Sequence, residues 1–415
     1  MDEDKKHSLS EEEKKADERL KKRQEERILR KKQEREKQQK RNRIIMVVIA
    51  LLVLLFIIFG ISSCVSSCVK NSTANAQANN AGAESPTQTA TAVAVPSDAQ
   101  TATQPVSTND IQDNGEDGYV TDSGIYIWNN QAFEMFYGDE SMAQTYASAI
   151  SYYRQQLDSS INVYNMVVPT HIAFGLPDRL ENSVDSKNQA DYLNAVYNSY
   201  STDVKGVNIF NALEQHKTEY IFFNTDHHWT SLGAYYAYQE FCLTAGEAPV
   251  DINTITPYDI PGFVGSLYTA TNAEVLNNNP DTVRYYDMPE TYTMNLLQQD
   301  ATEYMTLDSM YYSGSTAGSE TYGVFIWGDN PVTKIVNTQP KNSRKLLVVK
   351  ESFGNAIVPW FINNYNEVHA IDFRYYEGNL SSYCTENGIT DVLFINGVMS
   401  SSNSFQLDSM SSLFA

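Results

Sequence analysis

One short motif carries most of the residues that could do chemistry. Thr225–Tyr236 reads TDHHWTSLGAYY and holds two of the six histidines of the chain, beside an aspartate and a tryptophan (Trp229). In an extended segment, residues i and i+2 point to the same side, so Asp226 can orient the imidazole of His228. The second ring nitrogen of His228 is then free to remove a proton from a hydroxyl nucleophile. His227 points the other way in this arrangement and is, with Trp229 and His171, a candidate for contact with the substrate.

Two other interpretations of this motif remain open. A zinc site needs three or four protein ligands. The additional histidines that qualify are His171 and His216, and neither forms a helical pair with His227 or His228. The motif can also be a polar strand end without chemistry. We expect no bound metal and no other cofactor.

A serine suited to pair with His228 lies about 120 residues downstream. The stretch Lys345–Phe361 reads KLLVVKESFGNAIVPWF, which predicts a strand, a turn containing Ser352, and a helix-like segment. Backbone N–H groups at a helix start favour an anion, which suits a nucleophile whose attack creates an oxyanion. Gly354 permits close backbone approach, and Asn355 follows it. The alternative is that Ser352 only caps the helix.

A further turn can supply oxyanion donors. Trp327–Pro331 reads WGDNP, in which Gly328 offers a backbone N–H and Asn330 a side-chain amide. Both are useful donors to a tetrahedral intermediate. The alternative is that this sequence forms an ordinary turn without a catalytic role.

Apolar runs alternating with helical segments must position these residues. We predict buried strands over 161–169, 219–223, 345–350, 368–373 and 391–396, and helices over 140–157, 188–200, 231–246 and 381–388. This rhythm indicates an α/β fold with a mostly parallel sheet and helices on both faces. Residues from about 250 to 325 look like an insertion of loops and short strands. Chemistry in such folds lies beyond the carboxyl ends of the strands.

The N-terminal part has a different composition. Residues 1–43 are a charged tail in which basic residues outnumber acidic ones, although the whole chain has a net charge of −21. Ile44–Ile61 has no charged residue, and a span needs about 20 apolar residues, so we predict a transmembrane helix over 44–66. The basic tail places the N-terminus in the cytoplasm. Residues 67–118 are small and polar and predict a disordered linker to an extracellular domain over 119–415.

A cleaved signal peptide and a lipoprotein anchor are the alternatives to a retained transmembrane helix. A cleaved signal peptide normally has a shorter charged region, which favours a retained helix. The sequences before Cys64 and Cys68 loosely match a lipoprotein cleavage box. Cys242 and Cys384 are far apart, and no Cys-x-x-Cys pair indicates a thiolate zinc site.

Four motifs together resemble a known family. YIFFNTDHHWTSLGAYYAYQEFC, GFVGSLY, KLLVVKESFGNAIVPWF and NGITDVLFING are similar to those of the DHHW family of membrane-anchored proteins. That family is similar to the SGNH-hydrolase-like accessory proteins of alginate O-acetylation. The resemblance covers about Tyr119 to the C-terminus. It implies a circularly permuted SGNH-hydrolase-like fold with Asp226, His228 and Ser352 as catalytic triad.

The sequence departs from the family pattern at two places. Relatives usually have aspartate before the serine, and this chain has Glu351. The usual Gly-Asn-His appears as Gly328-Asp329-Asn330, which weakens the assignment of oxyanion donors.

The resemblance implies an extracytoplasmic step in O-acylation of a cell-surface glycan or cell-wall polymer, beside a membrane-bound O-acyltransferase as donor partner. An esterase with the same triad is the alternative, and a non-catalytic scaffold subunit is the third hypothesis. The acidic composition after the membrane segment disfavours nucleic acid as a partner.

Overall fold

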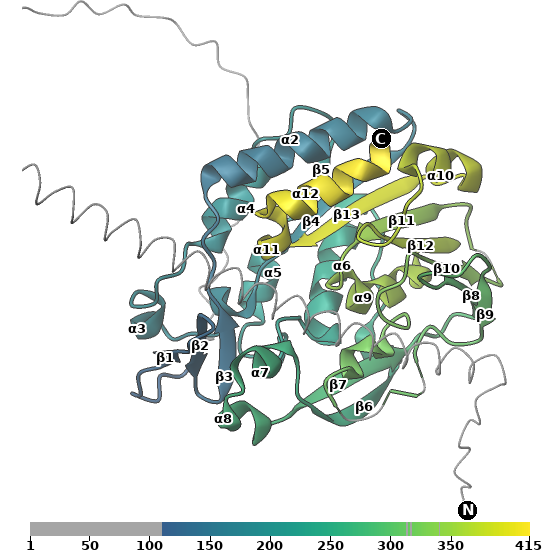
Figure 1. Cartoon of the computed structure of the whole chain (residues 1–415). Coiled ribbons are helices and arrows are strands. Elements are labelled where there is room, and N and C mark those ends of the chain that lie inside the picture. Colours follow the sequence, from purple (N-terminus) through teal and green to yellow (C-terminus); the bar gives the residue numbers. More distant parts are fainter. Residues whose placement is uncertain (1–109, 313, 316–317, 340) are drawn as a thin grey trace, which may run out of the picture. The chain divides into compact units, whose positions relative to one another are not determined.

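A large mixed sheet forms the centre of the protein in this computed structural model (Figure 1). The structure describes residues 110–312, 314–315, 318–339 and 341–415. The eight strands, in spatial order, are β5 (Lys205–Gly206), β4 (Asn162–Val168), β13 (Asp391–Gly397), β11 (Lys345–Lys350), β12 (Glu367–Asp372), β10 (Val332–Asn337), β8 (Tyr292–Leu297) and β9 (Met305–Leu307).

The sheet is parallel on one side and antiparallel on the other. β5, β4, β13, β11 and β12 pair in parallel, whereas β10, β8 and β9 pair antiparallel to their neighbours. The prediction of a mostly parallel sheet therefore holds for one half of it. The other half includes β8 and β9, which come from the segment predicted to be an insertion. Antiparallel neighbours need no crossover helix, so short connections can build this half.

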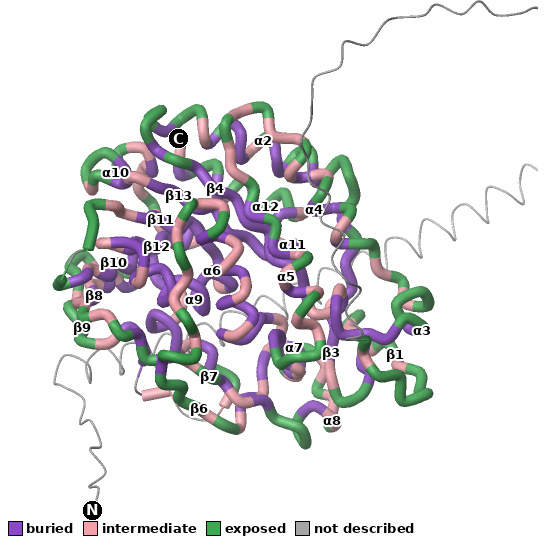
Figure 2. Tube along the Cα trace, turned by 180° about the vertical axis from the view of Figure 1, so that it is seen from behind, coloured by how far each residue is buried: buried purple, intermediate pink, exposed green. Residues whose placement is uncertain are grey.

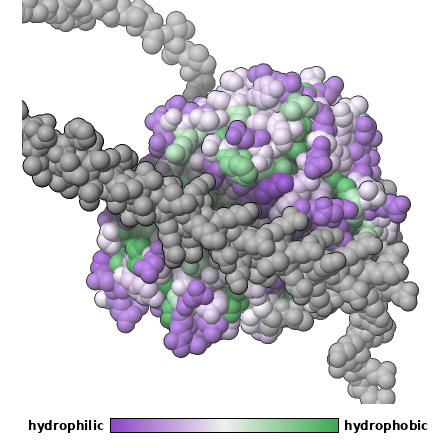
Figure 3. Space-filling view, viewed as in Figure 1, coloured by the Kyte–Doolittle hydropathy of each residue, from purple (hydrophilic) through white to green (hydrophobic). Residues whose placement is uncertain are grey.

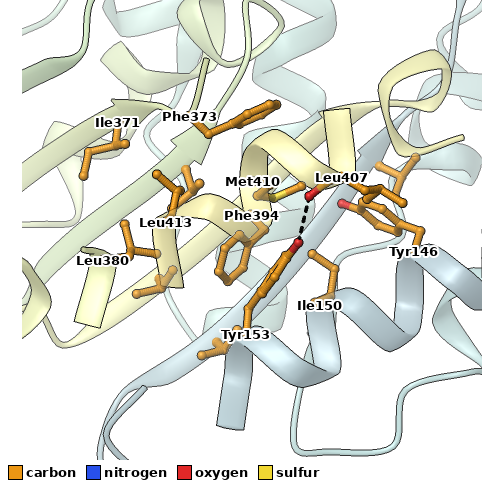
Figure 4. Packing of buried hydrophobic residues seen from close by; sticks show 14 of the residues in the cluster. Tyr146, Ile150, Tyr153, Ile371, Phe373, Leu380, Phe394, Leu407, Met410 and Leu413 are labelled. Carbon is orange, nitrogen blue, oxygen red and sulfur yellow. Dashed lines mark hydrogen bonds between the residues drawn. The ribbon is translucent and has the colours of Figure 1, made fainter. Parts of the chain in front are cut away.

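Helices cover both faces of the sheet, as the alternating pattern predicted. One face is covered by α2 (Glu140–Gln156), α4 (Gln189–Tyr197), α10 (Leu380–Asn387) and α12 (Ser404–Ser411). Figure 4 shows this layer, in which Tyr153 of α2 packs near Phe394 of β13 and donates a hydrogen bond to the Leu407 carbonyl at 3.2 Å.

The opposite face is covered by α6 (Ser231–Ala245), α9 (Gly354–Ile357) and η4 (Val358–Asn363). Phe241 of α6 packs on Tyr164 of β4 and on Phe361 of η4, with ring centroids 5.0 and 4.9 Å apart. The strands between the two layers are buried almost throughout (Figure 2). Such burial on both faces explains why these strands read as continuous apolar runs.

Two smaller sheets and several short helices complete the described part. The sheets pair β1 (Tyr119–Val120), β2 (Ile125–Trp128) and β3 (Gln131–Glu134), and β6 (Thr256–Phe263) with β7 (Asp281–Asp287). The short helices are α3 (Asp178–Glu181), α5 (Phe210–Gln215), α7 (Ser266–Thr271), α8 (Glu274–Asn277), α11 (Val398–Ser401), η1 (His171–Ala173), η2 (Ile252–Thr254), η3 (Thr321–Val324) and η5 (Ser412–Phe414).

Most predicted elements lie within a few residues of the observed ones. Gly246 and Gly388, which the sequence placed at helix ends, have φ angles of 73° and 64° and close α6 and α10 in the left-handed conformation. The predicted strand over 219–223 is wrong, because its pairing is limited to an isolated bridge between Phe222 and Trp229. Its apolar side chains are buried by aromatic packing instead, for instance that of Phe223 on Phe263.

The predicted tail, the transmembrane helix and most of the predicted linker lie outside the described residues. Within the described ranges, no helix has the length and hydropathy that crossing a membrane requires. Polar and apolar residues are interspersed on the described part of the face in Figure 3. Close to the predicted start of the domain, Arg179 binds Asp113 and Asp117 at 2.6 and 2.5 Å.

Candidate functional site

The DHHW motif forms a tight loop rather than an extended strand end. Its base is closed by the bridge between Phe222 and Trp229 and by the bond from the Phe223 N–H to the His228 carbonyl, at 3.2 Å. The backbone N–H of His228 donates to Oδ1 of Asp226 at 3.0 Å. The two side chains therefore share a side through this local turn, and not through the period of an extended segment.

The structure brings Asp226, His228 and Ser352 together in one chain of hydrogen bonds. Nδ1 of His228 lies 2.6 Å from Oδ1 of Asp226, and Nε2 lies 2.8 Å from Oγ of Ser352. Asp226 and His228 are buried, whereas Ser352 is half-buried. These contacts match the order nucleophile, base and orienting carboxylate that a hydroxyl nucleophile requires.

Asp226 is held by α7 on the side away from His228. The backbone N–H of Ser266 donates to its Oδ2 at 2.7 Å. A Cβ on Gly265 would lie 2.3 Å from Cβ of Asp226, so the approach of α7 requires glycine there. Burial by itself would raise the pKa of Asp226, but the electrostatic interaction with the neighbouring imidazoles of His228 and His227 and these hydrogen bonds hold it well below its ordinary value. Asp226 is therefore ionised.

Glu351 ties the serine turn to the end of β13. Its Oε2 accepts from the Phe353 N–H at 3.0 Å and lies 3.2 Å from Oγ of Ser352. Its Oε1 accepts from the backbone N–H of Gly397 at 2.7 Å. Glu351 is buried, so this carboxylate fixes the turn that presents Ser352. The sequence marked Glu351 as a departure from the family pattern, without a role.

Three aromatic side chains fix the position of His228 relative to the turn that contains Ser352. Tyr322 stacks on the imidazole of His228, with ring centroids 3.9 Å apart and planes 6° apart, and its hydroxyl donates to the Ser352 carbonyl at 3.0 Å. Trp229 donates from Nε1 to the Phe353 carbonyl at 3.0 Å. The ring of Phe353 lies 5.0 Å from that of His228. Tyr322 was missed because η3 carries no catalytic motif.

The predicted oxyanion donors have other partners in this structure. The amide nitrogen of Asn330 donates to the carbonyls of Trp327 and Gly328, at 2.9 and 3.4 Å, which is the plain-turn alternative. The N–H groups of Gly354 and Asn355 donate to the carbonyls of Glu351 and Ser352.

The side chain of Asn355 takes part in a charged network in which Lys350 and Asp372 are buried and Asp329 and Arg374 are partly exposed. Asn355 accepts from Nζ of Lys350 at 2.6 Å and donates to Asp329 at 2.9 Å. Lys350 also binds Asp372 at 3.2 Å, and Arg374 bridges Asp372 and Asp329 at 2.6 and 3.0 Å. Two cations and two carboxylates are thus matched beneath the serine turn, which satisfies charges that would be costly to bury alone.

Among the described residues, His171 and His216 do not belong to the group of possible ligands formed by Asp226, His227 and His228. His171 stacks on Phe222 and packs at a tilt against Phe133, and burial lowers its pKa to about 3. His216 binds Glu219 at 2.6 Å and stacks on Tyr236.

In the described part of the chain, the ligand atoms of Asp226, His227 and His228 lie within 4.8 Å of one another. Both ring nitrogens of His228 are already hydrogen-bonded, to Asp226 and Ser352. A metal ion on His228 would displace one of these bonds.

Asp281 anchors the start of the DHHW loop, and no sequence signal singles it out. This buried carboxylate accepts from the N–H of Asn224 at 3.0 Å, from the N–H and hydroxyl of Thr225 at 2.7 and 2.6 Å, and from the hydroxyl of Tyr220. The loop is thus fixed one residue before Asp226.

Comparison with known proteins identifies the family. A DHHW protein family model matches residues 78–371. The crystal structure of a DHHW family protein from Eubacterium siraeum is 33% identical, with a TM-score of 0.65, covering 72% of this chain and 99% of the other. Bacillus cereus PatB1, solved with a sulfonyl adduct, is 21% identical with a TM-score of 0.57, covering 68% and 97%, and shares the fold. The search of curated proteins gave no match. The family model and the 33% identical structure show that the chain belongs to the DHHW protein family.

Proposed function

We propose that the protein is an O-acyltransferase that modifies a cell-surface polysaccharide or cell-wall polymer through an acyl-enzyme on Ser352. The observation that carries this proposal is the unbroken chain of hydrogen bonds from Asp226 through His228 to the hydroxyl of the half-buried Ser352. A purely structural histidine would not need an ionised carboxylate on one nitrogen and a half-buried serine hydroxyl on the other.

Each residue has a defined role in the proposed reaction. Oγ of Ser352 attacks the carbonyl carbon of an acyl ester while its proton passes to Nε2 of His228. The bond from the carbonyl carbon to the leaving oxygen breaks, and His228 returns the proton to that oxygen. An acceptor hydroxyl then attacks the acyl-enzyme, gives its proton to His228, and the bond to Oγ of Ser352 breaks as the serine regains a proton. Asp226 stabilises the imidazolium in both steps.

The acceptor class and the partner come from the family. The resemblance to proteins of polysaccharide O-acetylation supports a glycan acceptor and a membrane-bound O-acyltransferase as donor partner. The chain order, with Asp-x-His before the serine, supports a circularly permuted SGNH-hydrolase-like arrangement. With water as acceptor, the same acyl-enzyme would make the protein an esterase.

A sulfonyl fluoride tests whether Ser352 is a nucleophile, a probe chosen because a sulfonyl adduct is recorded for PatB1. We expect the full-length protein to gain the mass of one sulfonyl group, and peptide mapping to place it on Ser352. Ser352→Ala should gain none, and Ser266→Ala should label normally as a serine control beside the same loop. Unlabelled wild-type protein would contradict the acyl-enzyme. Mass spectrometry of wall polymers from cells with and without the protein then identifies the acceptor.

We also propose that a helix over 44–66 anchors the protein with its N-terminus in the cytoplasm and residues 119–415 outside the cell. The support is the order of a basic tail and an uncharged apolar run. Protease added to intact protoplasts is expected to release a soluble fragment by cleavage within residues 71–118. Protection of the C-terminal domain would reverse the orientation, and a lipid-bearing N-terminus at Cys64 would replace the helix by a lipoprotein anchor.

A further inference from the structure

His227 lies beside the triad but does not belong to it. Its ring centroid is 3.8 Å from that of His228 and 5.8 Å from that of Phe353. Its Nδ1 is 2.5 Å from Oγ of Ser266, and its backbone N–H donates to the same oxygen at 3.4 Å. The imidazole is therefore fixed at one nitrogen by the first residue of α7, which also binds Asp226 through its backbone.

The other nitrogen of His227 is available. The side chain is 30% exposed, against 7% for His228, and the described residues place no hydrogen-bond partner at Nε2. Burial and the neighbouring His228 lower the pKa of His227, so its ring is neutral at pH 7. A neutral, oriented imidazole with a free edge offers one polar atom to a ligand without competing for the proton on His228.

We infer that His227 binds the acyl acceptor, through a hydrogen bond between its Nε2 and a sugar hydroxyl beside the one that is acylated. This inference rests on the proposed acyl-enzyme at Ser352. The acceptor hydroxyl must reach Nε2 of His228, which removes its proton, and the ring of His227 borders that position. A sugar carries hydroxyls on adjacent carbons, so one can meet His228 while its neighbour meets His227.

The contact with His227 would affect whether water or a sugar hydroxyl attacks the acyl-enzyme. Water has no second hydroxyl to place on His227, so this contact favours transfer over hydrolysis of the same acyl-enzyme. Acylation of Ser352 comes before the acceptor binds and does not use the contact. Loss of Nε2 should therefore change the fate of the acyl group and leave its arrival unchanged.

Two amide substitutions separate the two nitrogens. In His227→Asn the amide reaches the position of Nδ1 and can keep the bond to Ser266. In His227→Gln it extends to the position of Nε2. We expect a ratio of transfer to hydrolysis about tenfold lower than wild type in His227→Ala and His227→Asn, as for one lost hydrogen bond, and largely kept in His227→Gln. His216→Gln serves as a control, since His216 pairs with Glu219 away from the site.

The experiment uses full-length protein with p-nitrophenyl acetate as donor and cellopentaose as acceptor. The burst of p-nitrophenolate measures acylation, and mass spectrometry of acetylated cellopentaose against free acetate measures the ratio. Bursts should stay within about twofold of wild type in all His227 variants. An unchanged ratio in His227→Ala would overturn the inference, as would bursts that fall in step with the ratio, or a wild type that is acylated but transfers nothing. A wild type without any burst would instead remove the proposed function itself.

Discussion

Ser352→Ala and His228→Ala are each expected to slow turnover of p-nitrophenyl acetate about a millionfold, the loss seen for the same residue types in a serine protease. Without Ser352 no acyl-enzyme forms. Without His228 the hydroxyl loses the imidazole that lies 2.8 Å from it, and the Glu351 carboxylate at 3.2 Å is a much weaker base than an imidazole. The double variant should be no slower than either single one, since the residues act as one unit. Burst and steady-state kinetics of the purified protein measure both rates.

Folding controls decide whether such losses are chemical. Ser352 lies at a half-buried turn, so its variant should unfold at nearly the same temperature as wild type. His228 is buried and stacked on Tyr322, so His228→Gln accompanies the alanine variant to retain more of the packing. Full activity of folded Ser352→Ala would exclude Ser352 as the nucleophile, whereas folded wild-type protein without turnover would leave the scaffold hypothesis standing.

The parallel half of the fold could be predicted because its strands are buried on both faces. The predicted strand 345–350 coincides with β11, and β4, β12 and β13 differ from prediction by at most one residue at either end. Continuous apolar runs of this length identify such strands directly. The strand predicted over 219–223 from the same kind of apolar run does not form. These residues are buried by surrounding side chains without pairing in a sheet, and a buried segment has an apolar sequence whether or not it is a strand.

The strands of the antiparallel half could not be predicted from continuous apolar runs. β10 carries Lys334, whose Nζ binds Asn387 and lies over the Tyr383 ring, so the strand does not show an unbroken apolar pattern. The long stem of lysine covers apolar surface while its charge meets a partner. That partner comes from α10, far along the chain, and no local pattern reports it.

In the site, the three triad residues could be predicted from the sequence, but the residues that hold them in position could not. An Asp-x-His pair and a serine after a strand are local signals. The carboxylate of Glu351 on Gly397 and the ring of Tyr322 on His228 depend on how distant segments meet. The hydrogen-bond partners of the residues expected as donors at 328–330 and 354–355 are likewise set by the folded turn, and their role toward an oxyanion stays a prediction.

Asp226→Asn is expected to slow acyl-enzyme formation by roughly four orders of magnitude, as the equivalent change does in a serine protease. The carboxylate accepts from Nδ1 of His228, which leaves Nε2 without a proton and able to act as base. An asparagine amide can donate to Nδ1 instead, which favours the tautomer with the proton on Nε2. That tautomer cannot accept the proton of Ser352. The burst rate of p-nitrophenolate release measures the loss.

The same variant separates the triad from the metal interpretation. If the motif held an ion, Asp226, His227 and His228 would be equivalent ligands, and each substitution should remove activity together with bound metal. The triad instead predicts severe losses for Asp226→Asn and His228→Ala, a full burst for His227→Ala, and no effect of a chelator on any of them. The expected difference between the two histidine variants follows from their contacts. His228 is hydrogen-bonded to both Asp226 and Ser352, whereas His227 is hydrogen-bonded to Ser266. Equal loss of the burst from both histidine variants, with inactivation by chelator, would establish the metal site and remove the triad.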